Sequence, residues 1–230
     1  MKKLFRILAV ALLVLIISLF AFYLIKNESL PEGKSGPEAD QVAQEMMATL
    51  NKLAWDSTSN VSWTFKGIHQ YEWNRVNHSV LVKWDGNEIL LYTEKGSAEV
   101  IKSKADKLRP EAKANLISQA FDYFNNDSFW LYAPFKAFDP GTERSLVTLT
   151  DGREGLKVKY NSGGSTPGDS YVWLLDENHR PTAVKMWVSI LPLGGMEFTW
   201  ENYTELSSGA LIAQDHILYN GVNIDITDLK

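Results

Sequence analysis

Hydrophobic and polar residues follow three successive patterns along the chain, and the first is an uncharged apolar run from Ile7 to Ile25. An α-helix of this length spans roughly 28 Å, close to the hydrocarbon thickness of a bilayer. The run is longer than a typical signal-peptide core, and Phe20, Phe22 and Tyr23 stand where a cleavage site needs small residues. We therefore expect an uncleaved transmembrane anchor over residues 1–26, with a long signal peptide as the alternative.

The residues that flank this run predict its orientation. Lys2, Lys3 and Arg6 precede it, so the positive-inside rule places the N-terminus in the cytoplasm. The remaining chain is then expected on the periplasmic or extracytoplasmic side, as in a single-pass protein of a bacterial inner membrane. Residues 27–37 are polar and contain Pro and Gly, which is typical of a flexible linker.

Helical spacing of apolar residues is the second pattern. It predicts one helix over about 38–55 and a second amphipathic helix over about 110–124. The polar run 125–128 favours a stop and can cap the segment after it. That segment, 129–138, is the most aromatic stretch outside the anchor. We interpret 106–138 as a helical lid.

The third pattern is a period of 2, which begins after residue 60. Val61, Trp63 and Phe65 alternate with Ser62 and Thr64, as in a half-buried antiparallel strand. The alternation recurs between turn signals such as Asn220-Gly221, and short turns favour pairing of consecutive strands. In the second half we expect strands at about 145–150, 155–160, 169–175, 181–190, 196–206, 210–218 and 222–228.

These elements predict a mainly β fold with α (α+β), in one domain over residues 38–230. It is a curved antiparallel half-barrel of about 11 strands, because a sheet of that size curls strongly. The N-terminal helix and the mid-chain helical insertion cover it, and one transmembrane helix precedes it.

The apolar face of such a sheet becomes concave, and two helical elements leave it partly uncovered. We expect a lipid-type pocket there, with a hollow completely filled by large side chains as the equal alternative. The aromatic residues of 129–138 then serve as a plug, as ordinary core or as a membrane contact. The candidate ligand-binding residues of the pocket and lid are Trp63, Phe65, Trp73, Trp84, Phe121, Phe124, Trp130, Tyr132, Phe135, Trp173, Met186 and Trp200.

Composition narrows the function. Without the four basic residues of 1–26, 19 Lys and Arg face 28 Asp and Glu, for a net charge of −9, which argues against a nucleic-acid partner. The chain has no cysteine and no metal-binding or nucleophile motif, so we expect no metal, no cofactor and no catalytic residue. His69 falls on the apolar face, where it is expected as a satisfied core histidine.

Three segments resemble a known family. "DSFWLYAPFKAFDPGT" (127–142), "YVWLLDENHRPTAVKMW" (171–187) and "FTWENYTELSSGALIA" (198–213) are similar to envelope proteins of the LolA/LolB lipoprotein-carrier superfamily. The resemblance covers about residues 38–218 and implies a half-barrel closed by helices, with a pocket for an apolar ligand. The chain departs from the family in keeping a helical anchor and in lacking a lipid-modified cysteine.

The expected function is therefore that of a membrane-anchored, non-enzymatic envelope protein that binds a lipid or acyl-type ligand in the concave face. The alternatives are an envelope scaffold or interaction module with a filled core, and an enzyme that acts on lipid or glycan. The expected partners are a hydrophobic small molecule or lipid and the membrane around the N-terminal helix; the sequence identifies no protein partner.

Overall fold

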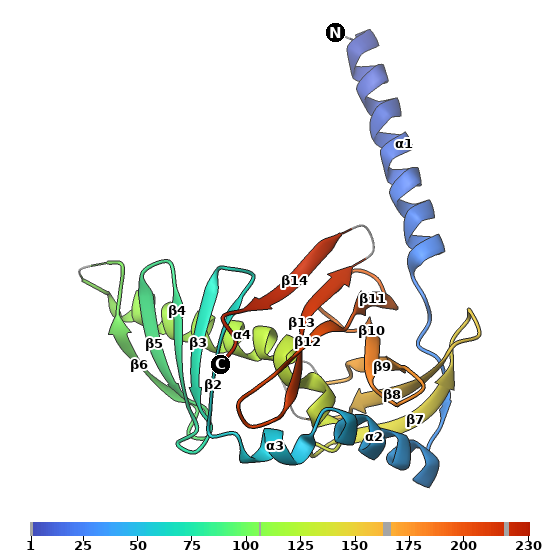
Figure 1. The fold of residues 1–230 in the computed structure, drawn as a ribbon. Coiled ribbons are helices and arrows are strands. Elements are labelled where there is room, and N and C mark those ends of the chain that lie inside the picture. Colours follow the sequence, from blue (N-terminus) through green and yellow to red (C-terminus); the bar gives the residue numbers. More distant parts are fainter. Residues whose placement is uncertain (1, 106, 163–166, 219–220) are drawn as a thin grey trace.

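The computed structural model describes residues 2–105, 107–162, 167–218 and 221–230. Helix α1 (Lys2–Lys26) stands apart from the folded part of the chain (Figure 1). Its apolar stretch, Phe5–Lys26, is long and apolar enough to cross a membrane, and its described side chains are exposed. A signal sequence near the N-terminus can meet the same criteria of length and composition.

The rest of the chain is built on one antiparallel sheet. Within the described residues its order is β1-β7-β8-β9-β10-β11-β13-β14-β2-β3-β4-β5-β6, with β12 paired to β13. The sheet is open, because β1 and β6 lie at opposite ends of this order. The strands are β1 (Gly33–Lys34), β2 (Asn60–Phe65), β3 (His69–Asn74), β4 (Ser79–Trp84), β5 (Asn87–Tyr92), β6 (Ser97–Lys102), β7 (Thr142–Thr148), β8 (Glu154–Tyr160), β9 (Ser170–Leu175), β10 (Pro181–Trp187), β11 (Met196–Thr199), β12 (Glu201–Glu205), β13 (Leu211–Leu218) and β14 (Val222–Thr227).

The predicted class, a mainly antiparallel sheet with a few helices, is confirmed, but the strand boundaries differ. The expected strand 196–206 is two strands, β11 and β12, separated at Trp200, whose N–H donates to the Thr182 carbonyl at 2.8 Å. The expected strand 181–190 ends at Trp187. Asn220 of the expected Asn220-Gly221 turn and residue 106 of the expected lid lie outside the described residues.

The first helix of the domain is also divided. The prediction of one helix over 38–55 is wrong, because α2 (Pro37–Thr49) and α3 (Lys52–Ser57) are separated at Asn51. Asn51 has a left-handed backbone, with φ of 57°, which asparagine tolerates well. Its Oδ1 accepts a hydrogen bond from the Ala54 N–H at 3.3 Å, so the side chain caps the second helix.

Helix α4 (Pro110–Tyr132) passes through the polar run at which we expected a stop, so that boundary is wrong. Asp127 and Ser128 are buried there. The Asp127 carboxylate is held by Tyr71 and His69 of the sheet and is thus not available as a cap. A short 3-10 helix, Ala133–Lys136, follows directly.

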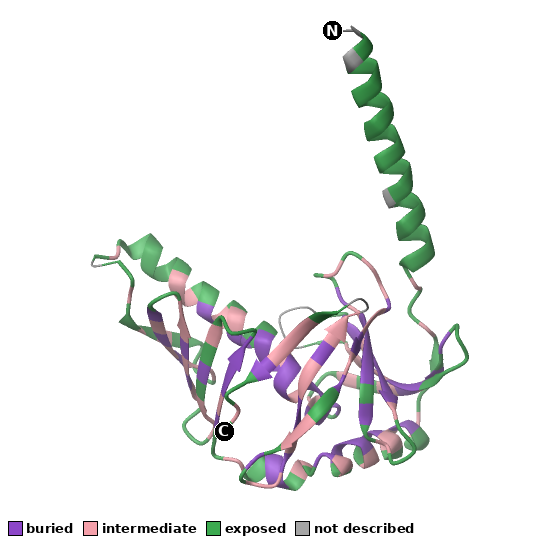
Figure 2. Cartoon of the chain, turned by 45° about the horizontal axis from the view of Figure 1, so that its top comes forward, coloured by how far each residue is buried: buried purple, intermediate pink, exposed green. Residues whose placement is uncertain are grey.

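The main hydrophobic core lies between the sheet and the helices that cover it. Figure 2 shows burial concentrated where α4 crosses the strands, whereas the described side chains of α1 are exposed. Helix α2 packs against β7 and β8, and α4 contacts β5, β6, β13 and β14. The concave face is therefore crossed by α4, and the way α4 fits it determines where space remains.

Candidate ligand site between the sheet and α4

The second half of α4 fills the centre of the concave face with aromatic side chains. Phe124 lies with its ring centroid 6.4 Å from Trp63 and 5.5 Å from Trp73. Trp130 lies 4.8 Å from Phe198 and 6.0 Å from Trp200. These contacts join strands from both halves of the sheet to one helix.

The structure places all of the predicted ligand-binding residues in this one core cluster. Trp73, Trp84, Phe121 and Tyr132 are partly buried and pack against it. The remaining members are buried: Trp63, Phe65, Phe124, Trp130, Phe135, Trp173, Met186 and Trp200. Their side chains contact one another, so at these positions the concave face is filled.

A buried carboxylate fastens α4 to the sheet. Asp127 is 1 % exposed, and its Oδ2 accepts a hydrogen bond from the Tyr71 hydroxyl at 2.5 Å. His69 Nδ1 lies 2.6 Å from the same oxygen, and the Asn126 amide donates to the other at 2.9 Å. Burial and the neighbouring charge of Asp127 raise the pKa of the Tyr71 hydroxyl well above its usual range. His69 is thus a satisfied histidine, as expected, and its partner belongs to the polar run 125–128 at which we expected the helix to stop.

His216 on β13 is a second polar group in this interface, and the sequence pattern did not indicate it. Its ring centroid is 3.9 Å from Trp200 and 5.2 Å from Trp130, and the residue is fully buried. Neither ring nitrogen has a hydrogen-bond partner of ordinary geometry within the part of the chain that the structure describes. Burial lowers the pKa of His216 to about 3, and the nearby backbone of Thr199 and the charge of Asp215 oppose this shift only in part. The ring is therefore neutral at physiological pH.

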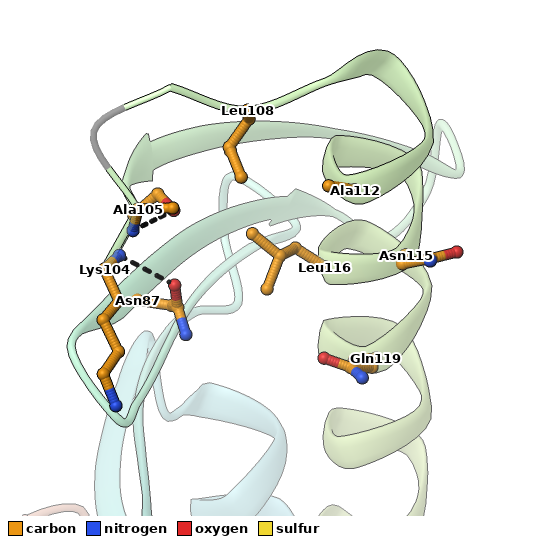
Figure 3. Close-up of a pocket in the computed structure, with 9 residues that line it drawn as sticks. Asn87, Lys104, Ala105, Leu108, Ala112, Asn115, Leu116 and Gln119 are labelled. Atoms are coloured by element: carbon orange, nitrogen blue, oxygen red, sulfur yellow. Dashed lines mark hydrogen bonds between the residues drawn. The ribbon is translucent and has the colours of Figure 1, made fainter.

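An open pocket of about 380 Å³ lies beside this filled region, under the first half of α4. In Figure 3 the Leu108 and Leu116 side chains point into the space between the helix and the strands. Lys104 closes one side, where its N–H donates to the Asn87 side-chain oxygen at 3.1 Å. The residues that line the pocket are Asn87, Ser103, Lys104, Ala105, Leu108, Ala112, Asn115, Leu116 and Gln119.

None of these lining residues is among the predicted ligand-binding residues, although five of them lie within the predicted lid, 106–138. The others come from the start of β5 and from the β6–α4 connection. A further signal within the lid was the small residue Ala112 one turn before Leu116, which leaves room beside a leucine. A second pocket, of about 350 Å³, lies under α2 and includes one predicted residue, Phe135, beside Met47 and Phe138. Among the described residues, no cluster of three or more His, Asp or Glu side chains could hold a metal ion.

Comparisons with known proteins yield no relative of this chain. No family model, curated protein or solved structure matches it. The protein is therefore classified by its architecture alone, which is an open antiparallel sheet crossed on one face by a long helix, with an apolar N-terminal helix.

Proposed function

We propose that the chain is a non-enzymatic protein, anchored in a membrane by α1, that binds an apolar chain in the pocket under the first half of α4. The observation that carries the proposal is this 380 Å³ space, lined by Leu108, Ala112 and Leu116. Its volume lies in the range of small-molecule sites, roughly 300–1,000 Å³. Apolar side chains next to a few amide groups suit an acyl chain with a small polar end.

Two further features support the proposal. The apolar stretch of α1 has the length and composition of a membrane span, and the basic residues before it favour a cytoplasmic N-terminus. The proposal also agrees with the LolA/LolB resemblance, which rests on the three sequence segments alone. The proposed ligand position differs from the one expected from the sequence: it lies under the first half of α4 and not among the aromatic side chains at the centre of the concave face.

The test is photo-crosslinking of the full chain in lipid nanodiscs with a fatty acid that carries a diazirine. Peptide mapping should find adducts at residues 103–119, in addition to adducts on α1 that serve as the internal standard. Ala112→Trp places a large ring in the pocket and should reduce the 103–119 adducts several-fold. Ala114→Trp, on the opposite side of the same helix, is the matched control and should leave them unchanged.

Two results would refute the proposal: adducts on α1 with none at 103–119, or an equal effect of the two tryptophan substitutions. The first would favour the second candidate function, an envelope interaction module with a solid core. The observation behind that candidate is that Trp63, Trp130 and Trp200 are all buried in one hydrophobic core cluster on the concave face. It predicts one stoichiometric protein partner after crosslinking in host membranes, recovered equally well with Ala112→Trp.

A further inference from the structure

The segment after α1 is not a loose tether, although its composition predicts a flexible linker. The Asn27 N–H still donates to the Tyr23 carbonyl at 2.8 Å, so the helix continues to the first residue of the segment. The Asn27 side-chain oxygen already accepts from the Gly194 N–H at 2.8 Å. The Glu28 N–H donates back to the Gly194 carbonyl at 3.0 Å. No residue therefore lies between the end of the helix and its first contacts with the sheet.

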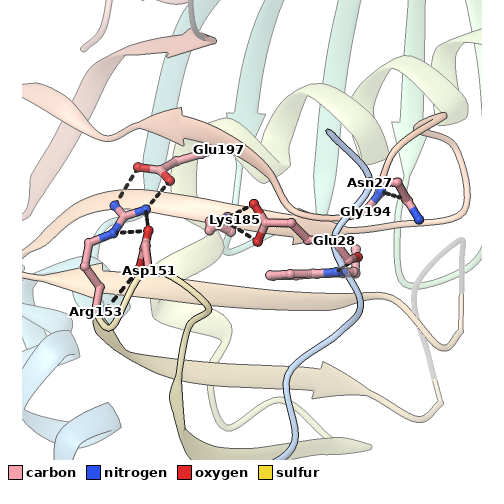
Figure 4. A network of polar contacts seen from close by, with 8 residues as sticks. Asn27, Glu28, Asp151, Arg153, Lys185, Gly194 and Glu197 are labelled. Atoms are coloured by element: carbon pink, nitrogen blue, oxygen red, sulfur yellow. Dashed lines mark hydrogen bonds and ion pairs between the residues drawn. The ribbon is translucent and has the colours of Figure 1, made fainter. Parts of the chain in front are cut away.

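Glu28 then holds the segment against β10 (Figure 4). The Lys185 ammonium, 5 % exposed, lies 2.6 Å from both carboxylate oxygens of Glu28. The Trp187 indole N–H donates to the Glu28 carbonyl at 2.8 Å. Farther along, the Lys157 ammonium donates to the Pro31 carbonyl at 2.7 Å, and β1 pairs with β7.

The sheet is shaped to receive this segment. A Cβ at Gly194 would lie 2.7 Å from the Glu28 carbonyl oxygen and 2.6 Å from Trp187 Cδ1. A Cβ at Gly195 would lie 2.8 Å from the Glu28 Cβ, and its φ of +80° also favours glycine. Both glycines thus permit the close approach of residues 27 and 28. The geometry fixes the end of α1 next to the β10–β11 connection.

That connection, residues 188–195, has no charged residue, although the chain outside α1 has a net charge of −9. Ile190 is 66 % exposed at its tip, with Leu191 and Leu193 half-buried beside it. The loop is ordered by contacts of its own, since the Ser189 N–H donates to Asp169 Oδ1 at 3.0 Å. An exposed apolar loop directly beside the end of a membrane helix is at the depth of the bilayer interface.

Other connections lie on the same edge of the sheet. Because neighbouring strands are antiparallel, their turns alternate between two edges. The connections 66–68, 85–86 and 188–195 share one edge with the β6–α4 connection, and Figure 1 shows α1 rising from this side. We name it the anchor edge. Ile68, 57 % exposed, lies on it, and the pocket under α4 has Asn87 and Leu108 at this edge.

From these contacts we infer that the anchor edge rests on the bilayer, with the 188–195 loop in its interface, so that the pocket under α4 faces the membrane surface. The inference rests on the proposed function, since α1 must be inserted. Interfacial segments bury their apolar side about 5–10 Å into the headgroup boundary. The pocket then takes its apolar chain from the adjoining leaflet.

Absence of cysteine makes the test direct, since one introduced thiol carries the only label. The full chain is labelled with an environment-sensitive fluorophore at Ile190→Cys and placed in vesicles of phosphatidylethanolamine and phosphatidylglycerol. Val76→Cys, 67 % exposed on the opposite edge, is the matched control, and Phe22→Cys in α1 reports insertion. With lipids spin-labelled near the headgroup, we expect the Ile190→Cys fluorescence to be quenched. We expect Val76→Cys to keep its fluorescence.

Quenching at Phe22→Cys, with Ile190→Cys as bright as Val76→Cys, would overturn the inference and leave the anchor intact. A bright Phe22→Cys would instead overturn the membrane anchor itself. A second measurement tests whether docking of the segment around Glu28 is what holds the anchor edge on the bilayer. Gly194→Val removes the space for Glu28, so quenching at an Ile68→Cys reporter should fall to the level of Val76→Cys. Unchanged quenching at Ile68→Cys would refute the role of the docked segment.

Discussion

His216 gives the interface between α4 and the sheet a predictable sensitivity to acid. Its pKa is about 3 in the folded chain because burial opposes the charged ring, whereas the unfolded value is about 6.5. Above pH 6.5 both states hold the ring neutral. As the pH falls from 6.5 towards 3, the unfolded state binds a proton that the folded state does not, and stability is lost.

The size of this loss follows from the two pKa values. A pH of 5 is about 1.5 units below the pKa of the ring in the unfolded state, and this difference corresponds to about 2 kcal/mol of lost stability. His216→Leu removes this titration and also two buried nitrogens that lack hydrogen bonds. At pH 8 we therefore expect the substitution to change stability by no more than about 1 kcal/mol.

The assay is urea unfolding of the full chain in mild detergent, followed by tryptophan fluorescence at pH 8 and pH 5. Between the two values wild type should lose about 2 kcal/mol more than His216→Leu. The control is His78→Asn, an exposed histidine with a left-handed backbone that asparagine tolerates, and it should behave as wild type. Equal losses in wild type and His216→Leu would refute the reasoning.

Two further predictions concern the packing of α4 and of the sheet. Asp127→Ala leaves Tyr71 and His69 without their shared acceptor, so urea unfolding should show a loss of about 3 kcal/mol. Asp122→Ala, which removes an exposed carboxylate of the same helix, should have little effect, and equal losses would contradict the role of Asp127. Gly155→Ala brings a Cβ within 2.5 Å of Val172 Cγ1 and should cost about 2 kcal/mol. Val172→Ala in the same chain should recover part of that loss, and strict additivity of the two changes would argue against the clash.

Period-2 patterns predicted the strands well, because burial of one face of a strand makes apolar and polar residues alternate in the local sequence. Trp63 and Tyr71, for example, are buried as their alternation indicates, and they pair across β2 and β3. Asp127 was misread because its local preference for capping competes with a tertiary contact, and only the latter is visible in three dimensions. The helix break at Asn51 was missed for a different reason: the apolar spacing of the predicted helix continues past this residue and does not mark where the backbone changes direction.

The candidate site was predicted less well than the fold. Aromatic residues such as Trp130 identify the buried face, but they also fill it, so the largest side chains mark where space is absent. The pocket is lined partly by Asn87, which begins β5, and by Lys104 in the β6–α4 connection, and neither residue has an apolar signal. The docked segment escaped prediction for a related reason: Glu28 is ordered by Lys185, which is 157 residues away in the sequence.

The two halves of α4 are packed differently, and under the proposed function this difference bears on how a ligand enters. Its second half buries Phe124, Trp130 and Leu131, each of which contributes about 1.5–3 kcal/mol when withdrawn from water. Lifting that half away would expose all three and break the contacts of Asp127, a cost comparable with the whole stability of a domain, about 5–15 kcal/mol. Its first half has exposed residues over 111–115 and a partly buried Leu116. Under the proposed function we therefore expect opening to involve the first half alone, with the size of Ala112 and Leu116 limiting what the pocket admits.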